Sequence, residues 1–370
     1  MLGTIQAGMR PVRPPPNSIA PNPIASRCDE LARAVVAIQF ERWPALYARY
    51  GEAGRDKCAE DLRFHVLYLA EAVAANSPAL FREYVGWVKV LFANIGIPVE
   101  ELGESLEILR DVIAARVDDA TAERVRACVA AALDGLPGMA VDVPRFIAED
   151  APHGALAKTY LDRLLAGDRR GATALVLDRV EGGMAVADVY LHVFQPTLRE
   201  VGRLWQTGAI SVAHEHFATA ATQAVMAQLY PRIFAAERCN RSMVATCVSG
   251  ELHEVGIRMV ADFFEMSGWD TYYLGANAPA RAIVQALRER NAHILAVSVT
   301  ISAHVGTVTD LIAAVRAELG DQPLRILVGG YPFNLVPDLW KAVGADACAA
   351  TAAEAVTVAG ALADSLPRTA

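Results

Sequence analysis

The chain has 370 residues, of which 54% are hydrophobic and 21% charged, so we expect two or three domains with sizeable cores. The net charge of −8 argues against nucleic-acid binding, which draws on clustered Lys and Arg. Six cysteines without CxxC spacing form neither a zinc pattern nor a disulfide framework, and no apolar run approaches the roughly 18 residues of a membrane span, so we expect a cytoplasmic protein.

The N-terminal part of the chain divides into a leader and a helical domain. Residues 1–27 contain six prolines and are predicted to be disordered. Residues 28–145 have helical periodicity throughout and are predicted to form an all-α sensor domain. Its predicted helices cover residues 33–50, 60–75, 76–94, 99–115 and 121–133.

A second helical block follows a short linker and covers residues 150–236. Its predicted helices span residues 154–166, 170–181, 185–208 and 211–235. Because the loops between them are short, we expect neighbouring helices to run antiparallel, as a four-helix bundle.

Strands and helices alternate in residues 240–370. The predicted strands are 243–248, 270–274, 294–299, 325–328 and 347–349. The predicted helices are 253–267, 278–290, 305–319, 334–343 and 351–366. This alternation predicts a five-stranded parallel sheet of Rossmann-like, doubly wound topology.

Three loops of this sheet carry the residues whose side chains most clearly indicate a binding site. Right-handed crossovers place the loops after the first, third and fourth strands at one edge, where open α/β sheets bind ligands. Those loops hold Glu251 and His253, Ser298 and Thr300, and Gly329 and Gly330. Two acids flank the histidine, and such neighbours commonly fix an imidazole's tautomer and raise its basicity as a metal ligand. By its position alone, His253 is equally compatible with an ordinary surface histidine.

The loops resemble the cobalamin-binding family. The elements of the family signature are present in order, as Glu251-x-His253-x-x-Gly256, Ser298-x-Thr300 and Gly329-Gly330. The resemblance implies that His253 is the axial ligand of cobalt, below a corrin ring whose own base it displaces. An imidazole is a suitable ligand for such a metal.

The same resemblance assigns roles to the other signature residues. The displaced tail of the cofactor would pass beside Ser298 and Thr300, and close to the backbone at the two glycines. Glu251 stands where the family often has aspartate and would support His253, while Gly256 would let the following helix approach the cofactor.

A second resemblance concerns the bundle. Trp205, Glu215 and His216 are arranged as in adenosylcobalamin-dependent light-sensing repressors, where such residues surround the adenosyl group. It implies adenosylcobalamin as cofactor, a photoreceptor in which light cleaves the cobalt–carbon bond, and a domain rearrangement that signals to a protein partner. Two features depart from those repressors: Gln206 replaces a histidine, and the N-terminal domain is not a basic DNA-binding module, so no direct nucleic-acid contact is expected.

The N-terminal domain resembles the degenerate globin-like modules of photocobilins. That resemblance implies biliverdin as a second chromophore, held by aromatic and basic groups. The residues concerned are Arg63, His65, Tyr68, Tyr84, Trp87 and Lys89. A heme, an aromatic core with a satisfied histidine, and a dimerisation surface that would make the protein a homo-oligomer are the alternatives.

Other functions fit the same fold. A corrinoid carrier protein for methyl transfer pairs a small helix bundle with this kind of sheet domain, and a cobalamin-sensing regulatory protein without photochemistry is a further alternative. No catalytic constellation is recognised in the sequence, so we expect a sensor or regulatory protein and not an enzyme.

Overall fold

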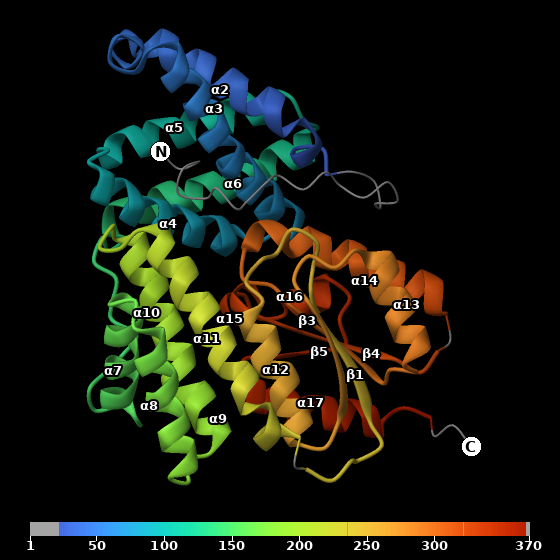
Figure 1. The fold of residues 1–370 in the computed structure, drawn as a ribbon. Coiled ribbons are helices and arrows are strands. Elements are labelled where there is room, and N and C mark those ends of the chain that lie inside the picture. The colour runs from blue at the N-terminus through green and yellow to red at the C-terminus, as the bar shows by residue number, and fades with distance from the viewer. Residues whose placement is uncertain (1–21, 235, 321, 368–370) are drawn as a thin grey trace.

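The structure, a computed structural model, describes residues 22–234, 236–320 and 322–367. In chain order it comprises an N-terminal helical domain, a helix bundle, and a parallel sheet with flanking helices (Figure 1). The predicted fold class is therefore confirmed: helical regions precede a Rossmann-like domain with a five-stranded parallel sheet. Among the described helices, none combines the length and the apolar character that a membrane crossing requires.

Proline and acidic caps set the helix boundaries of the N-terminal domain. The helices are α2 (Cys28–Arg42), α3 (Pro44–Ala74), α4 (Pro78–Ile95), α5 (Val99–Ala114) and α6 (Asp119–Gly135), with the short η1 (Ala25–Arg27) before and η2 (Leu136–Gly138) after them. Proline opens α3 and α4, and Asp118 caps α6 by accepting from the N–H of Thr121. The gap predicted between residues 50 and 60 narrows to a kink at Gly51, whose φ of 62° and ψ of −163° are not helical, and two helical segments of α3 meet there.

The prediction of a disordered leader over residues 1–27 is wrong for residues 22–27. Residues 1–21 lie outside the described residues, but 22–27 are folded onto the N-terminal domain. Ile24 has no exposed surface, and the side-chain amide of Asn22 donates to the carbonyl of Ala70 at 3.1 Å. Burial of the apolar side chain of Ile24 thus favours a folded conformation of this segment, although the surrounding sequence is rich in proline.

The bundle contains α7 (Gly154–Leu165), α8 (Arg169–Glu181), α9 (Val186–Val189), the π-helical turn η3 (Tyr190–Phe194), α10 (Gln195–Gln206) and α11 (Val212–Ile233). The single helix predicted for residues 185–208 is interrupted by η3. Pro196 is the second residue after this turn and has no N–H to bond the preceding turn, which accounts for the wider π-helical turn. The bundle packs on the sheet domain because Met259 and Phe263 of the latter belong to the bundle's core.

The sheet consists of β1 (Ser242–Cys247), β2 (Asp270–Gly275), β3 (Ile294–Ser298), β4 (Arg325–Gly329) and β5 (Ala347–Ala349). Its strand order is β2-β1-β3-β4-β5, and every pairing is parallel. The order reverses between β1 and β3, which is where such sheets bind ligands. In register, Ser298 pairs with both Cys247 and Gly329, so the ends of β1, β3 and β4 are level at one edge.

Helices flank both faces of this sheet (Figure 1). They are α12 (Val255–Met266), α13 (Ala280–Glu289), α14 (Val305–Leu319), α15 (Tyr331–Leu335), α16 (Leu339–Ala342) and α17 (Ala352–Asp364), with the short η4 (Ser302–His304) ahead of α14. The helix predicted at 334–343 is instead divided into α15 and α16. Val336 between them is extended, as expected of a residue that precedes a proline.

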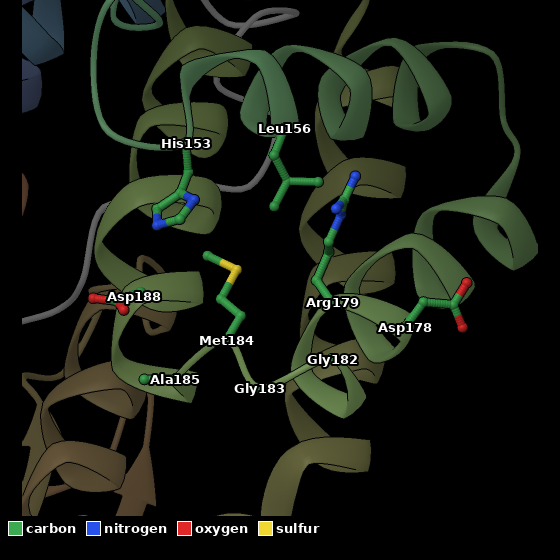
Figure 2. A pocket seen from close by; sticks show the side chains of 9 residues that line it. All are labelled: His153, Leu156, Asp178, Arg179, Gly182, Gly183, Met184, Ala185 and Asp188. Atoms are coloured by element: carbon green, nitrogen blue, oxygen red, sulfur yellow. The ribbon is translucent and has the colours of Figure 1, made fainter.

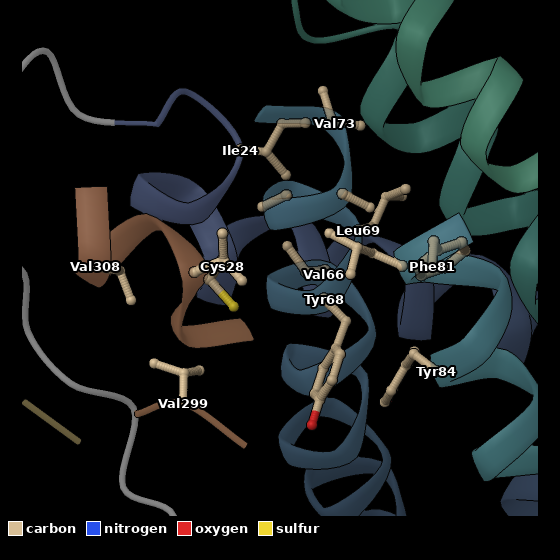
Figure 3. Packing of buried hydrophobic residues seen from close by; sticks show 14 of the residues in the cluster. Ile24, Cys28, Val66, Tyr68, Leu69, Val73, Phe81, Tyr84, Val299 and Val308 are labelled. Carbon is tan, nitrogen blue, oxygen red and sulfur yellow. The ribbon is translucent and has the colours of Figure 1, made fainter. Parts of the chain in front are cut away.

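The N-terminal domain shares a hydrophobic core with the sheet domain. Val66 and Leu69 of α3 belong to the same buried cluster as Val299 and Val308, which lie after β3 and on α14 (Figure 3). All four side chains are fully buried. The N-terminal domain therefore lies against the loop that follows β3, at the edge of the sheet where the candidate residues lie.

Candidate functional site

Glu251 joins the loop after β1 to the loop after β3. It is completely buried, and its Oε1 accepts from the backbone N–H of His253 at 3.0 Å and contacts Nδ1 of that histidine at 2.6 Å. Its Oε2 accepts from the N–H groups of Thr300 and Ile301, both at 3.0 Å, and lies 3.2 Å from Nδ1 of His304. Burial acts to raise the pKa of Glu251, but the hydrogen bonds and charges of the two imidazoles outweigh it and hold that pKa well below its usual range.

His253 is held by one ring nitrogen and free at the other. Nδ1 is engaged by Glu251, and within the described residues Nε2 has no hydrogen-bond partner. The side chain is 51% exposed. Burial of the ring would lower the pKa of His253, yet the contact with Glu251, and to a lesser degree the charge of Glu215, raise it overall.

The geometry of this loop is suited to supplying one ligand to the cobalt of a corrinoid. Such a ring supplies its own nitrogen ligands in the plane, so one imidazole is the contribution required from the protein. Among the described residues, no group of three or more His, Cys, Asp or Glu is placed to hold a metal ion by itself. The space beside His253 is open: a Cβ added at Gly256 would meet nothing within 4 Å, and Leu252 is 51% exposed.

The two glycines at the end of β4, Gly329 and Gly330, are explained in part by packing within the protein. Gly330 has φ of +105°, and a Cβ there would lie 1.9 Å from the carbonyl oxygen of Val299. At Gly329 a Cβ would lie 3.1 Å from the carbonyl oxygen of Ala349. The close packing of the loops after β3 and β4 thus explains Gly330 without a cofactor, and the predicted passage of a tail beside Ser298 stays a prediction.

The three residues predicted above the ring come from the end of α10 and the start of α11. The ring of Trp205 lies 6.1 Å from that of Trp87 in the N-terminal domain. Glu215 Oε2 lies 2.6 Å from Nδ1 of His216, whose side chain is 73% exposed. Gln206, at the position where the repressors have histidine, is buried and donates to the carbonyl of Trp87 at 3.2 Å. The N-terminal domain therefore contacts the end of the bundle that was predicted to cover the cofactor.

The residues proposed to hold a bilin are each engaged with other groups of the protein. Tyr68 stacks on Tyr84 with ring centroids 3.7 Å apart, and the hydroxyl of Tyr84 lies 2.6 Å from Nδ1 of His65. His65 is buried, and burial lowers its pKa to about 4. The ammonium of Lys89 donates to the carbonyls of Leu136 in η2 and of Met139 directly after it, and Arg63 pairs with a surface aspartate. Tyr68, Tyr84 and His65 are thus packed as a core, and bilin binding stays a prediction.

Sequence reasoning missed several residues that connect the parts. Glu71 of α3 accepts from the N–H of Gly306 at 2.7 Å, and Tyr331 donates to Glu83 of α4. Glu254 accepts from the amide of Gln223 in the bundle at 2.8 Å and also from side-chain and backbone donors of the sheet domain. The only sequence signal for Glu254 was its place beside His253, and no local pattern pointed to the other contacts.

A separate cavity of about 450 Å³ lies on the bundle (Figure 2). It is lined by His153, Leu156, Asp178, Arg179, Gly182, Gly183, Met184, Ala185 and Asp188. All of these belong to the segment from the start of α7 to α9, so the cavity is distinct from the loops around Glu251.

Comparisons with known proteins match the same two parts of the chain. Residues 241–359 match the family model of a B12 binding domain, and residues 156–230 match a second model, also described as a B12 binding domain. The chain is similar to dimethylamine corrinoid protein 1 of Methanosarcina acetivorans, with 23% identity over 209 residues, which are 54% of this chain and 96% of that protein. Monomethylamine corrinoid protein 1 of Methanosarcina mazei is 23% identical over 203 residues, covering 53% and 92% respectively.

Among solved structures, that of the monomethylamine corrinoid protein of Methanosarcina barkeri has a TM-score of 0.50 and 19% identity, and covers 56% of this chain and 98% of that one. This likeness supports the fold. The curated relatives contradict the expected function. They are dimethylamine and monomethylamine corrinoid proteins, so the prediction of a photoreceptor in which light cleaves the cobalt–carbon bond is wrong, and the methyl-transfer alternative has the better support.

Proposed function

We propose that this chain, which belongs to the cobalamin-binding proteins by virtue of its B12 binding domains at residues 156–230 and 241–359, is a corrinoid carrier for methyl transfer. The observation that carries the proposal is the free Nε2 of His253 beside a buried carboxylate, at the reversal point of the sheet. Its similarity to methylamine corrinoid proteins directs the choice toward methyl transfer.

In this proposal the bound corrinoid supplies a cobalt that accepts and gives up a methyl group. His253 would hold this cobalt through Nε2, and Glu251 would hold the Nδ1 proton so that the imidazole keeps one tautomer and one orientation. The buried carboxylate also balances positive charge when the histidine gains a proton, because Glu251 remains ionised.

The loops after β3 and β4 would hold the tail of the cofactor. Ser298 and Thr300 are partly exposed at the sheet edge and offer hydroxyl groups. The backbone there is fixed, since the N–H of Thr300 is bound to Glu251 and Gly330 is packed against the neighbouring loop. A preformed edge of this kind reduces the ordering that binding requires.

The bundle would shield the upper face between transfers. Trp205, Glu215 and His216 lie at its end, where Trp205 and Gln206 contact the ring and the carbonyl of Trp87 in the N-terminal domain. We expect this cover to move when a methyltransferase partner reaches the cofactor. The chain itself would then be a carrier acted on by enzymes, and not an enzyme.

The first experiment tests the ligand. Protein labelled with ¹⁵N-histidine is loaded with hydroxocobalamin, reduced to the cobalt(II) state, and studied by EPR, where a ligated imidazole nitrogen splits the cobalt lines. We expect the ¹⁵N pattern in wild type and in His293→Ala, whose histidine lies at the opposite edge of the sheet. We expect its loss in His253→Ala. A wild type that keeps the cofactor's own base on cobalt would refute the assignment.

The second experiment tests methyl transport. The loaded protein is reduced further with titanium(III) citrate and given methyl iodide, and its absorption spectrum is followed. We expect the protein-bound cofactor to be methylated in stoichiometric amount and to stay bound through gel filtration. Release of the cofactor on methylation, or failure to react, would count against a carrier.

A further inference from the structure

Helices α3 and α4 of the N-terminal domain contact three separate parts of the chain around the candidate site. Glu71 of α3 bonds to the segment after β3, and Glu83 of α4 bonds to the segment after β4. Trp87 of α4 contacts the ring of Trp205 at the end of the bundle. The side of the domain formed by α3 and α4 therefore borders both the sheet edge and the bundle end, the two parts between which a corrinoid would lie.

Tyr68 lies on this side of the domain, one helical turn before Glu71. Residues three apart share one face of a helix, and Tyr68 belongs to the same buried cluster as Val299, the residue directly after β3. In Figure 3 its hydroxyl points away from the core side chains Leu69 and Val73. The phenol thus extends from α3 on the face that packs against the loop after β3.

The hydroxyl of Tyr68 has no hydrogen-bond partner within the part of the chain that the structure describes, although only 9% of the residue is exposed. Tyr84, whose ring stacks on Tyr68 at 3.7 Å, directs its own hydroxyl to Nδ1 of His65 at 2.6 Å. A buried tyrosine usually bonds its hydroxyl in this way. The unpaired oxygen of Tyr68 is not sealed off from solvent, so it opens on accessible space. Such a hydroxyl is available to a ligand that enters beside the domain.

The chemistry of this hydroxyl suits the rim of a corrin ring. Burial raises the pKa of Tyr68, and the charge of Glu251 adds to the rise, so the phenol stays protonated and can donate. The rim of the cobalamin ring carries uncharged acetamide and propionamide side chains, whose carbonyl oxygens accept hydrogen bonds from such donors. A neutral hydroxyl matches a neutral carboxamide, whereas recognition of the phosphate in the cofactor's tail would favour arginine or lysine.

We propose that the side of the N-terminal domain formed by α3 and α4 is a third wall of the corrinoid site, where the hydroxyl of Tyr68 donates a hydrogen bond to a carboxamide on the rim of the ring. This inference rests on the proposed function, since it requires a corrinoid at the sheet edge. It gives a role in cofactor binding to a domain that lies outside both matched B12 binding domains.

The test removes one hydroxyl at a time from the stacked pair of tyrosines. Full-length wild type, Tyr68→Phe and Tyr84→Phe are titrated with hydroxocobalamin, and the change in visible absorption gives the Kd. We expect Tyr68→Phe to bind about 3- to 10-fold more weakly, because one hydrogen bond to the ring is lost. Tyr84→Phe should bind as wild type does, because its hydroxyl is bonded to His65 inside the domain.

Urea unfolding of the same variants without cofactor separates binding from packing. We expect Tyr68→Phe to be no less stable than wild type, since it keeps the stacked ring and loses no hydrogen bond within the described chain. Tyr84→Phe should be less stable than wild type, because it leaves the buried Nδ1 of His65 without its partner. A loss of stability in Tyr68→Phe without cofactor would assign its hydroxyl a structural role and overturn the proposal.

Cobinamide, which keeps the ring and lacks the nucleotide tail, identifies the part of the cofactor that Tyr68 contacts. We expect Tyr68→Phe to weaken the binding of diaquocobinamide by the same factor as that of hydroxocobalamin. A loss seen with hydroxocobalamin alone would assign the contact to the tail and contradict the proposal. If wild type binds hydroxocobalamin and Tyr68→Phe binds it equally well, or both variants are weakened equally, only this proposal fails. If wild type binds neither corrinoid, the proposed function fails and the third wall fails with it.

Discussion

Replacing Glu71 with glutamine removes a carboxyl group from the contact between the N-terminal domain and the sheet domain. Its Oε2 accepts from the N–H of Gly306 at 2.7 Å. Burial raises the pKa of Glu71 from 4.5 to about 7; the hydrogen bond from Gly306 opposes this change, and the charge of Asp310 adds to it. The glutamine side chain keeps an oxygen that can accept the same hydrogen bond but cannot ionise.

The pKa shift sets the size and the sign of the effect. A change from 4.5 to about 7 corresponds to about 3 kcal/mol of free energy of unfolding. Because the pKa is higher in the folded state, this contribution is complete below pH 4.5 and is lost as the pH rises through 7. Glu71→Gln should therefore unfold with nearly the wild-type free energy at about pH 5, and exceed wild type by up to about 3 kcal/mol at about pH 8.5.

Two measurements check this expectation. Urea unfolding followed by tryptophan fluorescence gives the stability difference at each pH, and amide hydrogen exchange of residues 302–308 shows whether the contact itself is affected. Glu83→Gln is the control, because Glu83 lies at the same contact but is exposed and bonded to Tyr331. A difference between Glu71→Gln and wild type that is constant across pH, or that shrinks as pH rises, would refute the reasoning.

Two further substitutions test packing in the same way. Gly330→Ala should lower the free energy of unfolding by more than about 2 kcal/mol in the absence of cofactor, because the residue has a positive φ and an added Cβ would clash with backbone. Gly329→Ala should cost less. Equal costs in chemical denaturation would contradict the packing argument. Tyr190→Phe removes the hydroxyl that donates at 2.7 Å to the buried Asp262 and should cost about 1–3 kcal/mol. Burial raises the pKa of Asp262 to about 6, so Tyr190→Phe should lose more stability above that pH, where the carboxylate is ionised, than below it. A loss of stability that does not depend on pH would argue against this role of the Tyr190–Asp262 hydrogen bond.

Local patterns in the sequence were sufficient to predict the fold of the C-terminal sheet domain. Alternating strands and helices predicted a parallel sheet, and the structure places the loops after β1, β3 and β4 at one edge. The Glu251–His253 pair could be predicted for the same reason, since both residues lie on one loop and their interaction needs no distant partner. The hydrophobic periodicity of a helix or strand is a property of a few consecutive residues.

The sequence was misleading where a local pattern had a distant cause. The sequence predicted a chromophore pocket that included His65, Tyr68 and Tyr84. In the structure these three side chains pack against one another between α3 and α4. Gly330 fitted a cofactor contact, yet the backbone of the β3 loop already requires it. In these cases the residue types were informative, but the neighbours that decide their role are remote along the chain.

The sequence by itself was enough to predict a five-stranded parallel sheet, the position of His253 at its edge, and Glu251 beside that histidine. Only the tertiary structure decided that α3 packs on η4, that His304 reaches Glu251, and that Trp87 contacts the end of the bundle. These contacts join segments that lie tens to hundreds of residues apart, such as Glu71 and Gly306. They depend on how the faces of whole domains fit together, and periodicity within one segment carries no information about that fit.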